Sequence, residues 1–227
     1  AGVTVLVTGA GAQASGLAGQ IESAGGKVVE FPTIEIQPPA DFVAFDAAID
    51  RIEEYDCLIF TSVNSVAPFL ARLRNAGKNG AALASLQVGA IGPETAKRLA
   101  SAGITATLVP ERYQAEGILD AVKPESMKGK RVLIPRAAEA REILPETLRT
   151  WGATVDVVVA YRTALPQINV APLTDLLLRK RIEVITFTSS STVRNFVRLF
   201  SDKKLMEITA QFTKKFVLAQ RFFPELI

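Results

Sequence analysis

The chain has 227 residues, of which 48% are hydrophobic and 22% charged, and its 26 lysines and arginines slightly exceed its 23 acidic residues. This composition is typical of a globular α/β protein and argues against a disordered or fibrous chain. The sequence holds no histidine and one cysteine, Cys57. Their scarcity argues against histidine-based acid–base or nucleophilic catalysis, a transition-metal site and an internal disulfide.

The expected environment follows from patterns that the sequence lacks. No apolar run reaches the roughly 20 residues that a membrane-spanning helix needs, and no basic run interleaved with aromatic residues indicates a nucleic-acid surface. The sequence starts on an apolar strand pattern with no basic segment before it, and a lone cysteine suits a reducing compartment. We therefore expect a cytoplasmic monomer without membrane or nucleic-acid partners.

Strands and helices are predicted to alternate along the chain. An apolar run at residues 3–8 predicts a strand, Leu17 and Ile21 recur at helical spacing after it, and Gly25 ends this helix before a strand at 27–31. The same reasoning predicts further strands at 56–60, 87–92, 105–110, 131–135, 154–159 and 183–187. Helices are expected at 65–73, 93–103, 115–122, 143–152 and 191–200. Such alternation favours mostly parallel sheets.

The sequence also repeats itself. Moving residues 3–73 by 127 positions places them on 130–200, where Gly25 falls on Gly152 and Phe60 on Phe187. A repeat of this length suits a small domain. The spacing changes towards the end, because Thr209 resembles Thr95 at an offset of 114. Either the second copy has shorter loops or residues are missing from it.

Two proline-bounded segments, near 32–39 and 160–166, occupy equivalent places in the two copies and are extended in character. Their placement predicts a crossed arrangement, an α/β protein with two similar doubly wound parallel-sheet domains joined by a two-stranded connector. The first domain is discontinuous, with residues 1–35 plus 165–227, and the second spans 36–164. A ligand site is expected where the two copies face each other.

Hydroxyl-bearing turns follow several predicted strands. In parallel sheets, loops and helix N-termini gather at the carboxyl ends of strands, where free amides bind carboxylates or phosphates. The candidates there are Thr61, Ser62, Asn64, Ser65, Gly92, Thr95, Thr188, Ser189, Ser190, Ser191 and Thr209. Each could instead simply cap a helix. Arg136 and Arg141 follow another strand as charged donors for an acidic ligand, or lie on a solvated helix face.

The first turn offers a competing motif. Gly9, Gly11 and Ala14 follow a strand and open a helix, and Glu30 ends the next strand, as in a dinucleotide-binding fingerprint. The second copy has Arg136 in the place of Gly9, and no catalytic Tyr-x-x-x-Lys accompanies the motif. A nicotinamide cofactor is therefore the weaker interpretation.

In their order, several segments resemble the uroporphyrinogen-III synthase family over nearly the whole chain. They are QASGLAGQIESAGGKVVEFPTIEI, FTSVNSV, AIGPETAKRLASAG, RYQAEGIL, RVLIPRAAEAREILPETLRTWGATVDVVVAYRT and FTSSSTV. The resemblance implies two α/β domains with the active cleft between them. It implies a cofactor-free cyclisation of hydroxymethylbilane, a linear polycarboxylate tetrapyrrole, to uroporphyrinogen III with inversion of ring D.

The resemblance also implies site residues. Tyr161 matches the connector tyrosine of the family and is expected to donate to the departing hydroxyl, since a phenol is protonated at neutral pH. Thr95 matches the threonine of a Gly-Pro-x-Thr-Ala element, and Thr209 is its weaker second copy. The family often has an arginine where this chain has Gly9, whereas Arg136 keeps one in the second copy. The alternative is a two-domain sensor of small anions that has no catalytic activity.

Overall fold

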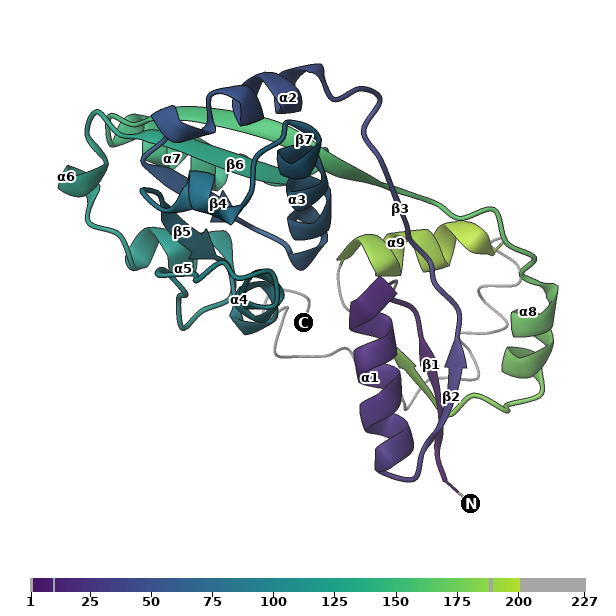
Figure 1. The fold of residues 1–227 in the computed structure, drawn as a ribbon. Coiled ribbons are helices and arrows are strands. Elements are labelled where there is room, and N and C mark those ends of the chain that lie inside the picture. The colour runs from purple at the N-terminus through teal and green to yellow at the C-terminus, as the bar shows by residue number, and fades with distance from the viewer. Residues whose placement is uncertain (1, 10, 188–189, 201–227) are drawn as a thin grey trace. The chain divides into compact units, whose positions relative to one another are not determined.

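The computed structural model describes residues 2–9, 11–187 and 190–200, without the side chains of residues 11–13, 190 and 191. It consists of two compact units (Figure 1). Unit 1 combines Ala1–Ile36 with Ala164–Ile227, and unit 2 is Gln37–Thr163. Within the described residues, no helix has the length and apolar character needed to cross a bilayer.

Unit 1 is built on a three-stranded parallel sheet. Its order is β2 (Lys27–Glu30), β1 (Thr4–Val7), β8 (Val184–Thr186). Three helices accompany it: α1 (Gly11–Ser23), α8 (Ala171–Leu178) and α9 (Ser190–Leu199). Leu6 packs in a cluster with residues of α8 and α9, whereas Val5 and Val7 pack with α1. Successive side chains of the central strand thus face opposite layers, which explains why all of β1 after Thr4 is apolar.

The sheet of unit 2 has five strands, and its edge strand begins in the last residues of the first segment of unit 1. Its order is β3 (Glu35–Gln37), β7 (Thr154–Ala164), β6 (Arg131–Ala137), β4 (Cys57–Phe60), β5 (Gln87–Ala90), and the pairs among β4, β5, β6 and β7 are parallel. Its helices are α2 (Val43–Asp50), α3 (Val66–Asn75), α4 (Pro93–Ala100), α5 (Ala115–Asp120), α6 (Pro124–Met127) and α7 (Ile143–Thr150). Short 3-10 turns lie at η1 (Ile52–Glu54), η2 (Val63–Ser65) and η3 (Gly80–Leu83).

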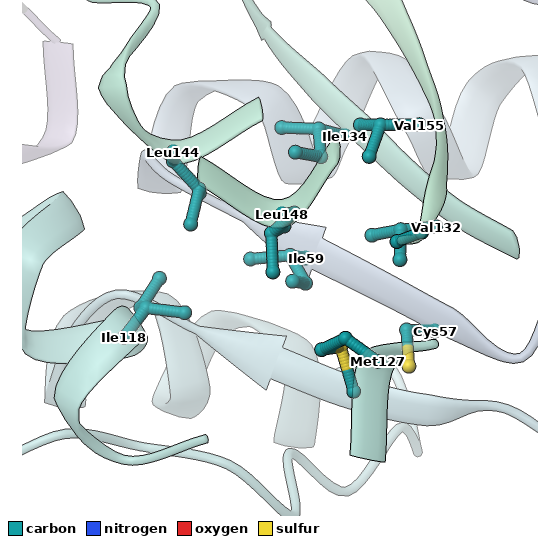
Figure 2. Close-up of a cluster of buried hydrophobic side chains, with 10 residues drawn as sticks. Cys57, Ile59, Ile118, Met127, Val132, Ile134, Leu144, Leu148 and Val155 are labelled. Carbon is teal, nitrogen blue, oxygen red and sulfur yellow. The ribbon is translucent and has the colours of Figure 1, made fainter. Parts of the chain in front are cut away.

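Helices cover both faces of this sheet. On one face Ile59 and Ile134 pack against Leu148 of α7 in the cluster that Figure 2 shows. On the other face the ring of Phe60 meets that of Phe69 on α3 edge to face, with 5.2 Å between ring centroids. Neighbouring residues of β4 therefore enter different layers, and this doubly wound α/β arrangement is the predicted fold class.

The internal repeat is preserved in the pairing register. In unit 1 Val5 lies opposite Val184, and in unit 2 Val132 lies opposite Cys57. Adding 127 to the number of Val5 gives Val132, and adding it to Cys57 gives Val184. The same two strand types are therefore paired in each unit, but in unit 1 they come from opposite ends of the described chain. This is the crossed pairing that the connectors predicted.

Two elements differ from the sequence prediction. The strand expected at 105–110 is reduced to a single bridge between Gly89 and Leu108, because Pro110 has no amide to extend the ladder. Strand β7 instead runs on through the predicted connector to Ala164, paired with β6 across a register shift at Arg136 and Ala137.

Candidate active site

The carboxyl edge of the unit 2 sheet collects most of the predicted site residues. Strands β4, β5, β6 and β7 are parallel neighbours, so the segments that follow or end them lie at one edge. These segments carry Thr61, Ser62, Asn64, Ser65, Gly92, Thr95, Arg136 and Tyr161. The fold therefore brings together residues that are up to 100 positions apart in the sequence.

Tyr161 of β7 is joined to the turn after β4 by a hydrogen bond. Its hydroxyl donates to Ser62 Oγ at 3.0 Å, and the side chain is only 6% exposed. Burial raises the pKa of the Tyr161 phenol, hydrogen bonds with the side chains of Ser62 and Asn64 lower it in part, and the charge of Glu139 raises it again. The phenol is thus a neutral donor at physiological pH.

The turn after β4 is fixed by its own hydroxyl groups. Ser62 is extended and caps η2, where its Oγ accepts a hydrogen bond from the Asn64 amide at 3.2 Å. The fully buried Ser65 donates from its Oγ to the Ser62 carbonyl at 2.7 Å. Ser65 therefore serves the local fold, whereas Ser62 both caps the turn and receives the Tyr161 hydroxyl.

Arg136 occupies the end of β6 and is buried, with 6% exposure. Its Nη1 donates to the Arg141 carbonyl at 2.8 Å, and its Nη2 forms an ion pair with Glu142. Its Nε is buried and has no hydrogen-bond partner. Arg136 therefore belongs to the strand, and the alternative of a solvated helix face is wrong because β6 extends two residues beyond the predicted 131–135.

A pocket of about 240 Å³ opens beside Arg136. Its polar walls include Thr61, Gln114 and Arg141, and Tyr113 forms an aromatic wall. Its apolar lining residues include Ile134 and Leu144, which Figure 2 shows in the core cluster of this sheet face. The pocket thus combines cationic groups with an apolar floor, as anion-carrying organic ligands require.

Gly92 and Thr95 lie at the start of α4, and Gly92 lies against Tyr113, which lines this pocket. A Cβ at Gly92 would come within 3.1 Å of the Tyr113 ring, so the glycine permits the ring to approach. Thr95 is buried in the first turns of α4. Gly92 therefore contributes by shaping the pocket wall rather than by offering a polar side chain.

The predicted residues of the second copy come after β8 in the sequence. Ser190 begins α9, whereas Thr188, Ser189 and Thr209 lie outside the described residues. All four stay predictions.

Sequence reasoning missed a buried polar network in unit 1. The Thr33 hydroxyl lies 3.2 Å from the carbonyl oxygens of both Thr8 and Thr192, and Asn195 donates to the Thr33 carbonyl at 2.9 Å. Thr8 in turn donates to the Thr186 carbonyl at 2.6 Å. These bonds tie the segment after β2 to β1, β8 and α9. No spacing rule reveals them, because they join residues far apart in the sequence.

The site also contains acidic groups that the sequence did not single out. Glu116 binds Arg141 through both carboxylate oxygens, at 2.8 and 3.0 Å, and Glu142 pairs with Arg136. In the described part of the chain, no group of three or more Cys, Asp or Glu side chains is arranged to hold a metal ion. The contacts that the structure describes at this edge are hydrogen bonds, ion pairs and apolar packing.

Comparison with known proteins gives a consistent result. A family model described as uroporphyrinogen-III synthase HemD matches residues 15–219. The uroporphyrinogen-III synthase of Synechococcus elongatus is 35% identical over 201 residues, which are 88% of this chain and 75% of that relative. The uroporphyrinogen-III synthase of Chlorobaculum parvum is 29% identical over 206 residues, covering 90% of this chain and 82% of the relative.

Two solved structures share the fold. A mutant uroporphyrinogen III synthase from Thermus thermophilus superposes with a TM-score of 0.67 at 16% identity, covering 95% of this chain and 83% of that one. The enzyme from Helicobacter pylori gives a TM-score of 0.54 at 16% identity, with coverage of 95% and 92%. At such identities the likeness supports the architecture. The match to the family model and the identity with the relative from Synechococcus show common ancestry as well. The chain belongs to the uroporphyrinogen-III synthase family.

Proposed function

We propose that this chain converts hydroxymethylbilane into uroporphyrinogen III, a cyclisation with inversion of ring D, and that Tyr161 donates to the departing hydroxyl. Membership of the family supports the reaction. The observation that carries the residue assignment is the Tyr161 hydroxyl, a buried neutral donor whose present acceptor, 3.0 Å away, is the hydroxyl of another side chain. A substrate hydroxyl can replace that acceptor without leaving a buried charge.

The reaction requires little acid–base machinery from the protein. The C–O bond of the hydroxymethyl group breaks, the oxygen takes a proton, and water leaves. The carbon left behind is a cation that the pyrrole nitrogen delocalises. The far ring attacks it through a substituted carbon, and the spiro intermediate fragments and recloses with ring D inverted. Loss of one proton in the last step balances the proton taken in the first, so the net change is the loss of one water.

The raised pKa of Tyr161 defines how it acts. Because burial keeps the phenol protonated far above neutral pH, it is always present as a donor. The same shift makes it a weak acid. Its contribution is therefore a hydrogen bond that strengthens as negative charge develops on the leaving oxygen, while the stable cation supplies the driving force.

Positioning is the second task of the protein. The substrate must fold so that one ring meets the carbon released at the other end, and holding such a geometry can contribute several kcal/mol to catalysis, on the order of 7 to 11 in well-oriented cases. Arg136, Thr61 and Gly92 are proposed to hold one part of the polycarboxylate at the carboxyl edge of unit 2. Ser190 and the predicted residues Thr188, Ser189 and Thr209 are proposed to bind it as well.

The test is to incubate the protein with freshly prepared hydroxymethylbilane and to separate the products by isomer. The type III isomer is expected in excess over a protein-free control. The type I isomer forms without an enzyme, so a product that is entirely type I would contradict the proposal and leave the anion sensor in its place.

A further inference from the structure

The pocket next to Arg136 holds two arginines, each already paired with a glutamate. Arg136 pairs with Glu142, and Arg141 pairs with Glu116. Both arginines line the pocket, together with Tyr113. The two glutamates balance the charge of these arginines.

Arg136 has unused hydrogen-bonding capacity. It is 94% buried, yet its Nε–H has no partner while both terminal nitrogens are bonded. Leaving a buried donor of a charged group unpaired costs about 1 to 3 kcal/mol or more. A guanidinium presents its donors as a planar fork that fits a carboxylate. The unpaired Nε–H of a pocket-lining arginine therefore points to an acidic ligand group.

The two glutamates are held loosely by comparison. The side chain of Glu142 is 51% exposed and that of Glu116 is 32% exposed, whereas the Arg136 side chain is only 8% exposed. Ion pairs open to water contribute about 0 to 1 kcal/mol. Turning Glu116 away from the exposed Arg141 thus costs little. Glu142 pairs with a buried arginine whose charge must stay compensated, so it moves into solvent only as another carboxylate takes its place.

The third wall suits an aromatic ring. Tyr113 is 54% exposed, and its ring lies close against Gly92. A half-exposed phenol ring beside two arginines is a surface on which a flat heterocycle can pack while its acidic side chain reaches the cations.

We propose that this pocket exchanges carboxylates. A ring that bears an acidic side chain packs against Tyr113, its carboxylate binds Arg136 and Arg141, and Glu142 and Glu116 move into solvent. This inference rests on the proposed function in taking one ring of a polycarboxylate tetrapyrrole as the natural occupant. The glutamates act as internal competitors, which keep the buried arginine paired until the acidic group arrives.

The test uses 3-phenylpropionate, an aromatic ring with one propionate side chain, and its uncharged amide as the matched probe. Both are titrated into the full-length protein while NMR follows the Nε–H resonance of Arg136. The acid is expected to shift this resonance and to bind at least about tenfold more tightly than the amide, as a charge-assisted pair in a buried site should. Equal binding of acid and amide would overturn the proposal.

Two variants separate exchange from simple attraction. Glu142→Gln keeps the size of the side chain but removes the competitor, so binding of the acid is expected to tighten several-fold. Arg136→Met should weaken it at least about tenfold. Arg179→Met is the control, because this substitution removes the same charge from an exposed ion pair, that of Arg179 with Asp175 in unit 1. Unchanged or weaker binding in Glu142→Gln would contradict the exchange even if Arg136→Met failed to fold.

The outcome can be told apart from a failure of the proposed function. If the probe behaves as expected but hydroxymethylbilane gives only the type I isomer, the pocket stands and the cyclisation does not. If the type III isomer forms but 3-phenylpropionate does not shift the Arg136 Nε–H resonance, the proposed cyclisation is supported and the proposed carboxylate exchange is wrong.

Discussion

Tyr161 donates a hydrogen bond to Ser62, and this bond ties β7 to the turn after β4 at the carboxyl edge of the unit 2 sheet. Ser62 is also the cap of η2, through the Asn64 amide. One hydroxyl therefore fixes the direction of the proposed donor and the geometry of the turn. Loss of that hydroxyl should disturb both.

Ser62→Ala tests this double role. Removing the cap is expected to lower the free energy of unfolding by about 1 kcal/mol, measured by urea denaturation. When the Tyr161 phenol donates to the substrate hydroxyl instead, the Ser62 hydroxyl can turn and donate to the phenol oxygen, so its loss leaves the phenol unsupported and kcat should fall while binding of substrate changes less. Ser62→Thr keeps the hydroxyl and should recover most of both losses; a kcat that stays low in Ser62→Thr would argue against the orientation role.

Stability at high pH should depend on Tyr55. Burial first, and then the Asp156 carboxylate that accepts its hydrogen bond at 2.5 Å, raises the pKa of Tyr55 to about 12. A tyrosine of the unfolded chain ionises near 10. The stabilisation is therefore complete below about pH 10 and disappears as the pH rises towards about 12, because the unfolded chain loses this proton first.

Tyr55→Phe removes this titration. Between about pH 10 and 12 the wild type is expected to lose about 2 kcal/mol more of its unfolding free energy than the variant does. Urea unfolding at several pH values measures the difference, because the two proteins differ in no other residue. Parallel curves for the two proteins would show that Tyr55 carries no such shift.

The buried network around Thr33 should stabilise unit 1. Thr33→Val preserves the shape of the side chain but removes the hydroxyl that reaches the Thr8 and Thr192 carbonyls. The Thr8 carbonyl keeps its hydrogen bond from the Thr33 backbone amide, at 3.0 Å, so only a buried side-chain hydrogen bond is lost and the free energy of unfolding should fall by about 0.5 to 1.5 kcal/mol. Thr154→Val is the control, since Thr154 is exposed on β7 and its change should stay within about 0.5 kcal/mol. Equal effects would contradict the network.

Gly92→Ala should alter the pocket wall more than the fold. The backbone of Gly92 is extended, so alanine is allowed there, but its Cβ would press on the Tyr113 ring at 3.1 Å. Tyr113 is half exposed and can move away. We expect a loss of about 0.5 to 1 kcal/mol from the weaker helix cap, together with a raised KM for hydroxymethylbilane. Gly80→Ala, whose Cβ would meet nothing closer than 3.9 Å, should leave KM unchanged.

The sequence predicted the architecture because the repeat preserves apolar positions, and apolar periodicity determines register. The pairing of Val5 with Val184 follows from that pattern even though most of the chain separates them. The prediction of a strand at 105–110 was wrong although the segment has the apolar pattern of a strand. The ladder stops at a single bridge because Pro110 has no amide hydrogen to donate.

The site was predictable only in its residue types. Hydroxyl groups after strands and a tyrosine in the connector located the carboxyl edge of the sheet. The partners of the arginines were not predictable. The pairing of Arg136 with Glu142 depends on how far β6 extends, and that of Arg141 with Glu116 joins the loop before α7 to α5. The burial of Arg136 was not predictable for the same reason, because the local sequence does not show whether a residue belongs to the end of a strand or to the loop after it.

The most direct test of the account is the isomer ratio that Tyr161→Phe produces from hydroxymethylbilane, compared with wild type and Tyr55→Phe. Tyr55 is a matched control because it is also buried and its hydroxyl also donates to a side chain, in this case the Asp156 carboxylate. Wild type and Tyr55→Phe should yield the type III isomer. Tyr161→Phe should form it at least about 100-fold more slowly, so that the spontaneous type I isomer dominates. Type III formation by Tyr161→Phe at the wild-type rate would contradict the assignment.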